Sequence, residues 1–165
     1  MSTRILPLLV LLIAAPAGAQ TTTAVDAVGG YAGFVDESLV DHAVFGVGGR
    51  IHLSPRISIG PEVVYMRGPR FDRDLFVTGN LTFDFLVAPP NARRGTVNPF
   101  VTVGAGLMRH SDRFGSNTFT SSEGAVTGGG GASVWLTDRV HALGEFRLGW
   151  EPHYRVTGGV GVAWP

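Results

Sequence analysis

The sequence predicts an all-β fold, in which eight antiparallel up-and-down strands close into a barrel. Apolar and polar residues alternate with a period of two through most of the chain beyond residue 25. Turn signals divide this region into eight segments of roughly ten or more residues. Every apolar run in it is interrupted by glycine, proline or a charge within about ten residues, which favours strands over membrane helices.

The composition excludes several functional classes. The 165 residues include 13 basic and 13 acidic side chains, so the charge excess of a nucleic-acid-binding protein is missing and no nucleic-acid partner is expected. The chain has no cysteine, which excludes a disulfide framework, a thiolate nucleophile and a cysteine metal site. Its length fits one ordinary domain. No cofactor is predicted.

The first residues have the three-part pattern of a secretory signal peptide. Arg4 precedes an apolar run from Ile5 to Ala15, and small residues follow up to Ala17-Gly18-Ala19. The apolar run is shorter than the ~20 residues that a membrane-spanning helix needs. We therefore expect a cleavable signal peptide at residues 1–19 and one barrel domain at residues 20–165.

The connections between the expected strands differ at the two ends of the barrel. The strands are expected at residues 25–35, 42–53, 57–67, 74–86, 98–109, 124–136, 140–150 and 154–164. Residues 54–56 and 137–139 form tight turns at one end. Longer loops at residues 36–41, 68–73 and 110–123 lie at the other end. The link at residues 87–97 belongs to the tight-turn end although it is long.

The polar face of the strands indicates which side of the barrel is inside. The apolar face carries no charge in the four clearest strands, whereas the other face carries Gly, Thr, Ser, Asn and Ala with one or two charges per strand. Small residues with balanced charges suit a narrow lumen, where buried charges need partners. We therefore expect an ion-pair network in the lumen, and apolar side chains facing lipid. Its candidate residues are Arg50, Glu62, Asp84, Glu145, Arg147 and Arg155.

Strand length and strand ends agree with a transmembrane barrel. Strands of about eleven residues match the ~9–11 that cross a bilayer at a tilt. Closure of the barrel removes free sheet edges, whose backbone N–H and C=O groups would find no hydrogen-bond partner in hydrocarbon. Pro61 cannot donate to a strand ladder, so we expect a bulge or a strand end there. Aromatic residues near the strand ends are expected to form girdles: Tyr65, Trp135, Trp150, Tyr154 and Trp164.

Several segments resemble a known family. Gly129 to Val140, Gly144 to Gly149, Ile59 to Val63 and Pro99 to Gly106 resemble the small eight-stranded outer-membrane β-barrel domain (OmpA/OmpX-like). The resemblance implies a Gram-negative outer membrane, tight turns in the periplasm and long loops at the cell surface. It also implies two partners, outer-membrane lipid and the barrel-assembly machinery, which reads a terminal aromatic residue. Here Pro165 follows that aromatic residue.

The sequence offers no strong catalytic or metal motif. The five histidines lack the close spacing of metal ligands, so no metal site is predicted. The apolar faces carry no His-x-Ser pair of the kind found in outer-membrane lipid A acylhydrolases, so no catalytic residue is predicted and Arg109 to Asp112 is not assigned to catalysis.

These observations predict a non-enzymatic integral outer-membrane protein with a filled polar lumen. Eight strands enclose an interior that side chains just fill, so a general diffusion pore is not expected. The loop at residues 110–123 is the expected contact surface, with Arg113, Phe114 and Phe119, and the sequence names no ligand. Two alternatives remain open: an outer-membrane lipid-modifying enzyme, and a secreted soluble barrel that binds an apolar ligand inside.

Overall fold

The computed structural model describes residues 22–35, 40–69, 71–86, 94–114, 117–150 and 152–165. The expected signal peptide at residues 1–19 lies outside the described residues. Over the described ranges, no helix is long and apolar enough to span a membrane.

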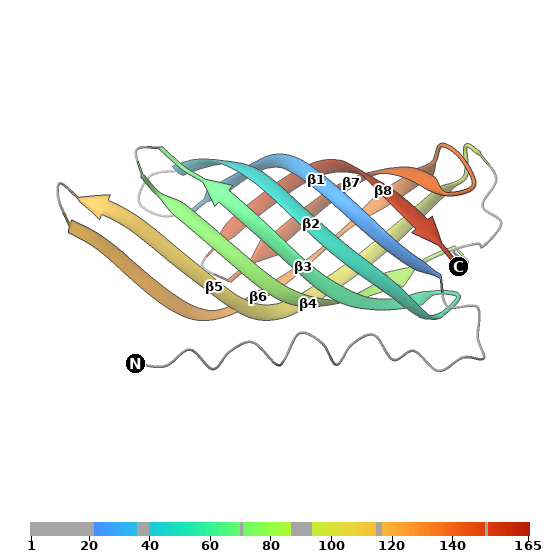
Figure 1. Cartoon of the computed structure of the whole chain (residues 1–165), viewed down its shortest axis with the longest axis horizontal. Helices are drawn as coiled ribbons and strands as arrows, with labels where there is room; N and C mark the ends of the chain where they lie inside the picture. Colours follow the sequence, from blue (N-terminus) through green and yellow to red (C-terminus); the bar gives the residue numbers. More distant parts are fainter. Residues whose placement is uncertain (1–21, 36–39, 70, 87–93, 115–116, 151) are drawn as a thin grey trace.

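Eight strands form one closed antiparallel barrel, as the sequence predicts (Figure 1). Each strand pairs with its neighbours in sequence order, and β1 also pairs with β8, which closes the sheet. The strands are β1 (Thr23–Phe34), β2 (Val40–Ser54), β3 (Ile57–Arg67), β4 (Arg73–Asp84), β5 (Val97–Phe114), β6 (Asn117–Trp135), β7 (Val140–Gly149) and β8 (His153–Trp164). Both tight turns lie at one end, here called the turn end.

The polar segment at residues 110–123 is a β-hairpin, and its prediction as a loop is wrong. β5 and β6 stay paired until Phe114 lies opposite Asn117, so Arg113, Phe114 and Phe119 belong to strands. The hairpin extends past the other strands at the end opposite the turn end (Figure 1), here called the hairpin end. A hairpin in water needs no apolar face, so the apolar alternation stops although the backbone pairing continues.

Side chains alternate between the outside and the inside of the barrel, with the apolar ones outside. Phe45, Val160 and Leu107 are 59%, 56% and 65% exposed. The alternate positions, which include nearly all the charged residues of the strand centres, are buried or half-buried. This is the reverse of a water-soluble barrel, whose apolar face points inward.

β3 runs without interruption through Pro61, so the bulge or strand end expected there is wrong. Pro61 pairs with β4, while the ladder to β2 continues on both sides of Gly60 and Pro61 in one register. A Cβ atom at Gly60 would lie 1.8 Å from the carbonyl oxygen of Gly49, so only glycine fits this close contact. The irregularity between β2 and β3 lies instead next to the tight turn, between His52 and Ser54.

Trp135 points into the barrel and does not join an outer aromatic girdle, contrary to the prediction. It is 7% exposed and packs with Ala24 and Ala163 at the turn end. Its ring centroid lies 4.9 Å from that of His141. Trp135 follows Ser133 by two positions in β6, so both side chains point to the inner face of the strand. Its place at a strand end does not by itself reveal this direction. Trp150 and Trp164, in contrast, are 68% and 42% exposed.

Candidate functional site in the barrel lumen

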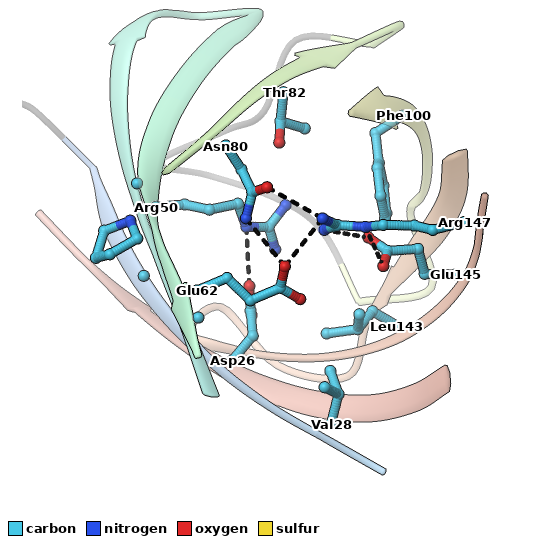
Figure 2. A pocket seen from close by; sticks show the side chains of 14 residues that line it. Asp26, Val28, Arg50, Glu62, Asn80, Thr82, Phe100, Leu143, Glu145 and Arg147 are labelled. Carbon is cyan, nitrogen blue, oxygen red and sulfur yellow. Dashed lines mark hydrogen bonds and ion pairs between the residues drawn. The ribbon is translucent and has the colours of Figure 1, made fainter. Parts of the chain in front are cut away.

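Four charged side chains from three strands form one network in the lumen. Figure 2 shows Glu62, Glu145 and Arg147 of this network. Nη1 of Arg147 lies 2.9 Å from Oε2 of Glu62, and its Nε lies 2.6 Å from Oε1 of Glu145. Nη2 of Arg155 lies 2.8 Å from Oε1 of Glu62 and 3.3 Å from Oε1 of Glu145. Asn80 completes the group by donating to Glu62 over 3.1 Å and accepting from Arg147 over 3.1 Å. We call these five residues the charged layer.

The register of β7 and β8 explains why this layer needs both acids. Arg147 and Arg155 lie directly opposite each other, an arrangement that is unfavourable for two like charges. Glu62 and Glu145 each contact both guanidinium groups, so the two positive charges are matched by two negative ones. Removing one partner of such a buried group leaves an uncompensated charge, which costs about 3–5 kcal/mol.

Arg50 lies in a second cluster, nearer the turn end. Its Nε donates to Oδ2 of Asp26 over 2.9 Å. Nε2 of His141 lies 2.8 Å from Oδ1 of the same carboxylate and donates to it. The Arg50 guanidinium also lies over the ring of Phe100, 5.8 Å from its centroid. Asp26 and His141 were not among the predicted network residues, although both have the inward parity that identified the others.

Asp84 is placed in a third group and has no arginine partner among the described contacts. Its Oδ1 accepts a hydrogen bond of 2.9 Å from Asn98, and Oδ2 lies 3.6 Å from Nε2 of His52. The structure therefore brings together four of the six predicted network residues. Arg50 and Asp84 point into the same lumen but toward different partners.

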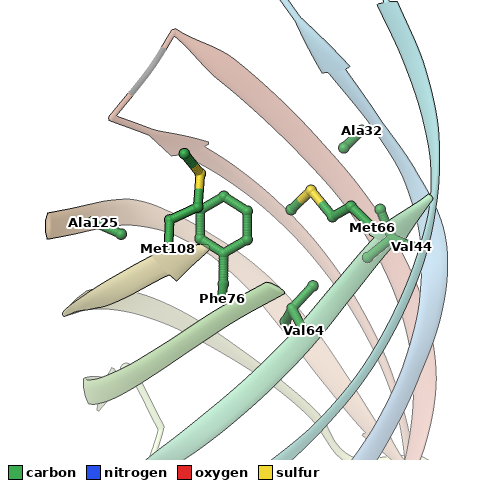
Figure 3. Close-up of a cluster of buried hydrophobic side chains, with 7 residues drawn as sticks. All are labelled: Ala32, Val44, Val64, Met66, Phe76, Met108 and Ala125. Atoms are coloured by element: carbon green, nitrogen blue, oxygen red, sulfur yellow. The ribbon is translucent and has the colours of Figure 1, made fainter. Parts of the chain in front are cut away.

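The lumen also contains an apolar layer, which the predicted filled polar lumen does not include. Figure 3 shows this layer. The order of inward residues along β3 places it on the hairpin side of the charged layer. On β3, for example, Glu62 is followed along the inner face by Val64 and Met66, which are 1% and 0% exposed. The cluster consists of Ala32, Val44, Val64, Met66, Phe76, Met108 and Ala125, and we call it the apolar layer.

The space left beside the charged layer is small. The cavity has a volume of about 50 Å³ and is lined by residues that include Arg50, Glu62, Thr82 and Phe100. One water molecule needs about 10–15 Å³ of such volume, so the cavity has room for a few waters. It is far below the ~300–1,000 Å³ of a typical small-molecule site.

Of the predicted surface contacts, Phe119 is 60% exposed on the protruding hairpin. Arg113 and Phe114 lie in β5, but the structure does not describe their side chains.

The fold is similar to that of solved bacterial barrels. The N-terminal β-barrel domain of Pseudomonas aeruginosa OprF superposes with a TM-score of 0.69 at 12% identity, over 89% of this chain and 100% of that one. Neisserial surface protein A (NspA) gives 0.69 at 12% identity, over 87% and 97%. Ail of Yersinia pestis, crystallised with the heparin analogue sucrose octasulfate, gives 0.61 at 10% identity, over 88% and 100%.

By sequence, neither a protein-family model nor a curated protein matches the chain. Because the structural similarities come with identities of 10–12%, they demonstrate the fold of small outer-membrane barrels. A shared fold does not determine function, which depends on the residues of each site.

Proposed function

We propose that this chain is a non-enzymatic integral protein of a Gram-negative outer membrane, exported by a signal peptide at residues 1–19. One observation carries the proposal: apolar side chains cover the outside of a closed barrel, while the charges of the strand centres point into its lumen. An apolar outer surface is stable in hydrocarbon. A sheet in hydrocarbon must also be closed, because an open edge would leave backbone groups without hydrogen-bond partners. In this account the barrel anchors the protein, and the β5–β6 hairpin extends beyond the membrane.

The two ends of the apolar surface carry the residues expected at membrane interfaces. Trp164 is exposed at the turn end, and Trp150 is exposed at the hairpin end. Arg67, Arg73 and Arg109 point outward on adjacent strands at the hairpin end, beyond the last outward-facing apolar residues of β3 to β5. Aromatic and basic residues at the two ends of the barrel support a lipid-facing apolar belt between them. The hairpin extends beyond this belt.

Histidine placement supports a non-enzymatic role over a lipid-modifying enzyme. An enzyme that acts on membrane lipid needs its base on the outer face, next to the lipid. All five histidines belong to the described residues, and each has inward parity: His42, His52, His110, His141 and His153. None of them faces the apolar outer surface.

The interior also argues against the second alternative, a soluble carrier of an apolar ligand. A carrier needs an apolar cavity inside the barrel, whereas the cavities between the lumen side chains have volumes of about 50 and 20 Å³ and are lined by charged groups such as Arg50. A larger cavity, of about 250 Å³, lies at the turn end beside Trp135 and Arg139. The filled lumen also argues against a diffusion pore.

The hairpin is the best candidate for contact with a partner. β7 pairs with β6 from Thr127 onward, so residues 117–125 of β6 have no strand neighbour on that side within the described chain. An exposed strand edge can accept an extended segment of another protein by backbone hydrogen bonding. Phe119 adds an exposed aromatic side chain.

Cell fractionation combined with heat-dependent gel mobility tests the proposal. The expected result is recovery of the exported protein, without residues 1–19, in the outer-membrane fraction. Its gel mobility should change when the sample is boiled. Recovery in a soluble fraction without detergent would contradict it.

Planar-bilayer recordings of the wild type and of Glu145→Gln test the closed lumen separately. Neither protein should raise the conductance above that of the bare bilayer, because the apolar layer closes the lumen even when the charged layer loses an ion pair. A stable open channel in the wild type would contradict the filled lumen.

A further inference from the structure

Three potential metal ligands meet at the hairpin end of the lumen. His42 of β2, Asp72 just before β4 and Asp74 of β4 each offer a ligand atom, and these atoms all lie within 4.8 Å of one another. Nε2 of His42 lies 2.9 Å from Oδ2 of Asp72 and 3.4 Å from Oδ2 of Asp74. We propose that His42, Asp72 and Asp74 bind a divalent transition-metal ion such as Zn²⁺.

The distances from His42 to the two carboxylates are compatible with a tetrahedral metal. Zinc binds imidazole nitrogen and carboxylate oxygen at about 2.0–2.2 Å, so two ligands of one tetrahedral ion are about 3.3–3.5 Å apart. The His42 to Asp74 distance of 3.4 Å agrees with this value. The His42 to Asp72 distance of 2.9 Å needs to widen by only a few tenths of an ångström.

Burial and the surrounding residues favour an ion at this position. The side chains of His42 and Asp74 are each 2% exposed and that of Asp72 is 21% exposed, so two of the three ligands are withdrawn from water and the third lies at the opening. Oδ1 of Asp72 accepts no hydrogen bond within the described residues, although Nδ1 of His110 lies 3.7 Å from it. Nδ1 of His110 lies 2.7 Å from Oδ1 of Asp74, a contact that orients this carboxylate as outer-shell residues do at metal sites.

Gly68 leaves open the space next to the ligand atoms. A Cβ atom there would lie 2.5 Å from Nε2 of His42 and 2.8 Å from Oδ2 of Asp72. The backbone amide of Gly68 also donates to the carbonyl oxygen of Asp72 over 3.0 Å, which holds the connection that carries this ligand. Any larger residue would enter the position that these two atoms face.

The ligand types select the class of metal. Neutral imidazole suits Zn²⁺ and other first-row transition ions, whereas Mg²⁺ and Ca²⁺ prefer oxygen ligands alone. Two carboxylates balance the charge of a divalent ion. Three protein ligands leave a position for water, as in open zinc sites. A bound ion would tie the β3–β4 connection to β2 and so stiffen this end of the barrel.

Zn²⁺ titration of the folded, detergent-solubilised barrel after chelator treatment tests the site. Isothermal calorimetry should show one Zn²⁺ per chain, and Mg²⁺ at the same concentration should not bind. His42→Asn and Asp72→Asn should each lose at least about tenfold in affinity. His52→Asn is the matched control, because this histidine lies in the same lumen next to Asp84 at the turn end, and its Zn²⁺ affinity should equal that of the wild type.

A second readout guards against variants that fail to fold. Zn²⁺ should raise the thermal unfolding midpoint of the wild type and of His52→Asn, but not that of Asp72→Asn, whose residue lies outside the strands. Gel mobility with and without boiling identifies the folded variants. Absence of saturable Zn²⁺ binding by the wild type, or unchanged binding by folded Asp72→Asn, would overturn the proposal and leave these contacts as structural hydrogen bonds only.

Discussion

The charged layer and the apolar layer fill neighbouring cross-sections of the same lumen by different physical means. In the charged layer, Arg147 and Arg155 make ion pairs of defined geometry with both acids. In the apolar layer, Met66 and Met108 are 0% and 2% exposed and fill volume next to Phe76. The first layer depends on complete pairing of its charges, and the second depends on packed volume.

This difference determines what each layer tolerates. Flexible methionine side chains adapt to irregular space, so the apolar layer accepts another side chain of similar size. A buried charge has no such substitute, because its desolvation is offset only by its partners. The two layers therefore close one lumen but differ in what they tolerate. The apolar layer should tolerate a substitution that conserves volume, whereas the charged layer should not tolerate one that conserves volume but removes a charge.

The largest effect is expected from Arg147→Met. The variant removes one of two positive charges that Glu62 and Glu145 share, so the free energy of unfolding should fall by about 3–5 kcal/mol. Denaturant unfolding in lipid vesicles measures it. Arg139→Met, at an exposed turn residue, is the matched control and should change stability by less than about 0.5 kcal/mol. Equal stability of the two variants would contradict the role given to the charged layer.

The apolar layer should respond to lost volume and not to altered shape. Met108→Ala should lower the free energy of unfolding by about 2–5 kcal/mol, because it leaves a cavity. Met108→Leu nearly conserves volume and should cost less than about 1.5 kcal/mol. The same unfolding assay compares the two variants. If they were equally destabilised, packed volume would not be what holds this layer together.

The sequence reveals the charged layer better than the apolar layer. Charges are rare in this chain, and their common parity on Arg147, Glu145 and Glu62 indicates a shared lumen. Val44 and Phe76 have the same inward parity, but in the sequence they are exceptions to the alternation. Only the register between strands places them at one height, and one sequence does not determine that register.

The hairpin and the cluster of His42, Asp72 and Asp74 cannot be recognised from the sequence, for related reasons. Residues 117–122 are exposed, so no apolar period indicates their strand. His42 and Asp72 are separated by 30 positions, and His110 and Asp74 by 36, so a search for closely spaced ligands does not find them. Barrel closure and strand register bring these residues together.

The smallest effect on stability is expected from shortening the hairpin. Ser111 and Thr120 are direct partners, so an Asn-Gly turn can replace residues 112–119 without changing the register. The free energy of unfolding should change by less than about 1 kcal/mol, because loop-closure entropy varies slowly with length. Unfolding in vesicles measures it. A loss as large as that of Arg147→Met would mean that the hairpin supports the barrel and is not an independent extension.

Two substitutions, compared by their unfolding free energies in lipid vesicles, test whether the outward-facing apolar side chains of the barrel contact lipid. Val160 is 56% exposed near the middle of β8, whereas Ser121 is exposed on the hairpin. Val160→Arg should cost about 2–4 kcal/mol, as expected for a charge facing lipid near the bilayer midplane. Ser121→Arg should cost less than about 0.5 kcal/mol. Equal stability of the two variants would contradict the claim that this surface faces lipid.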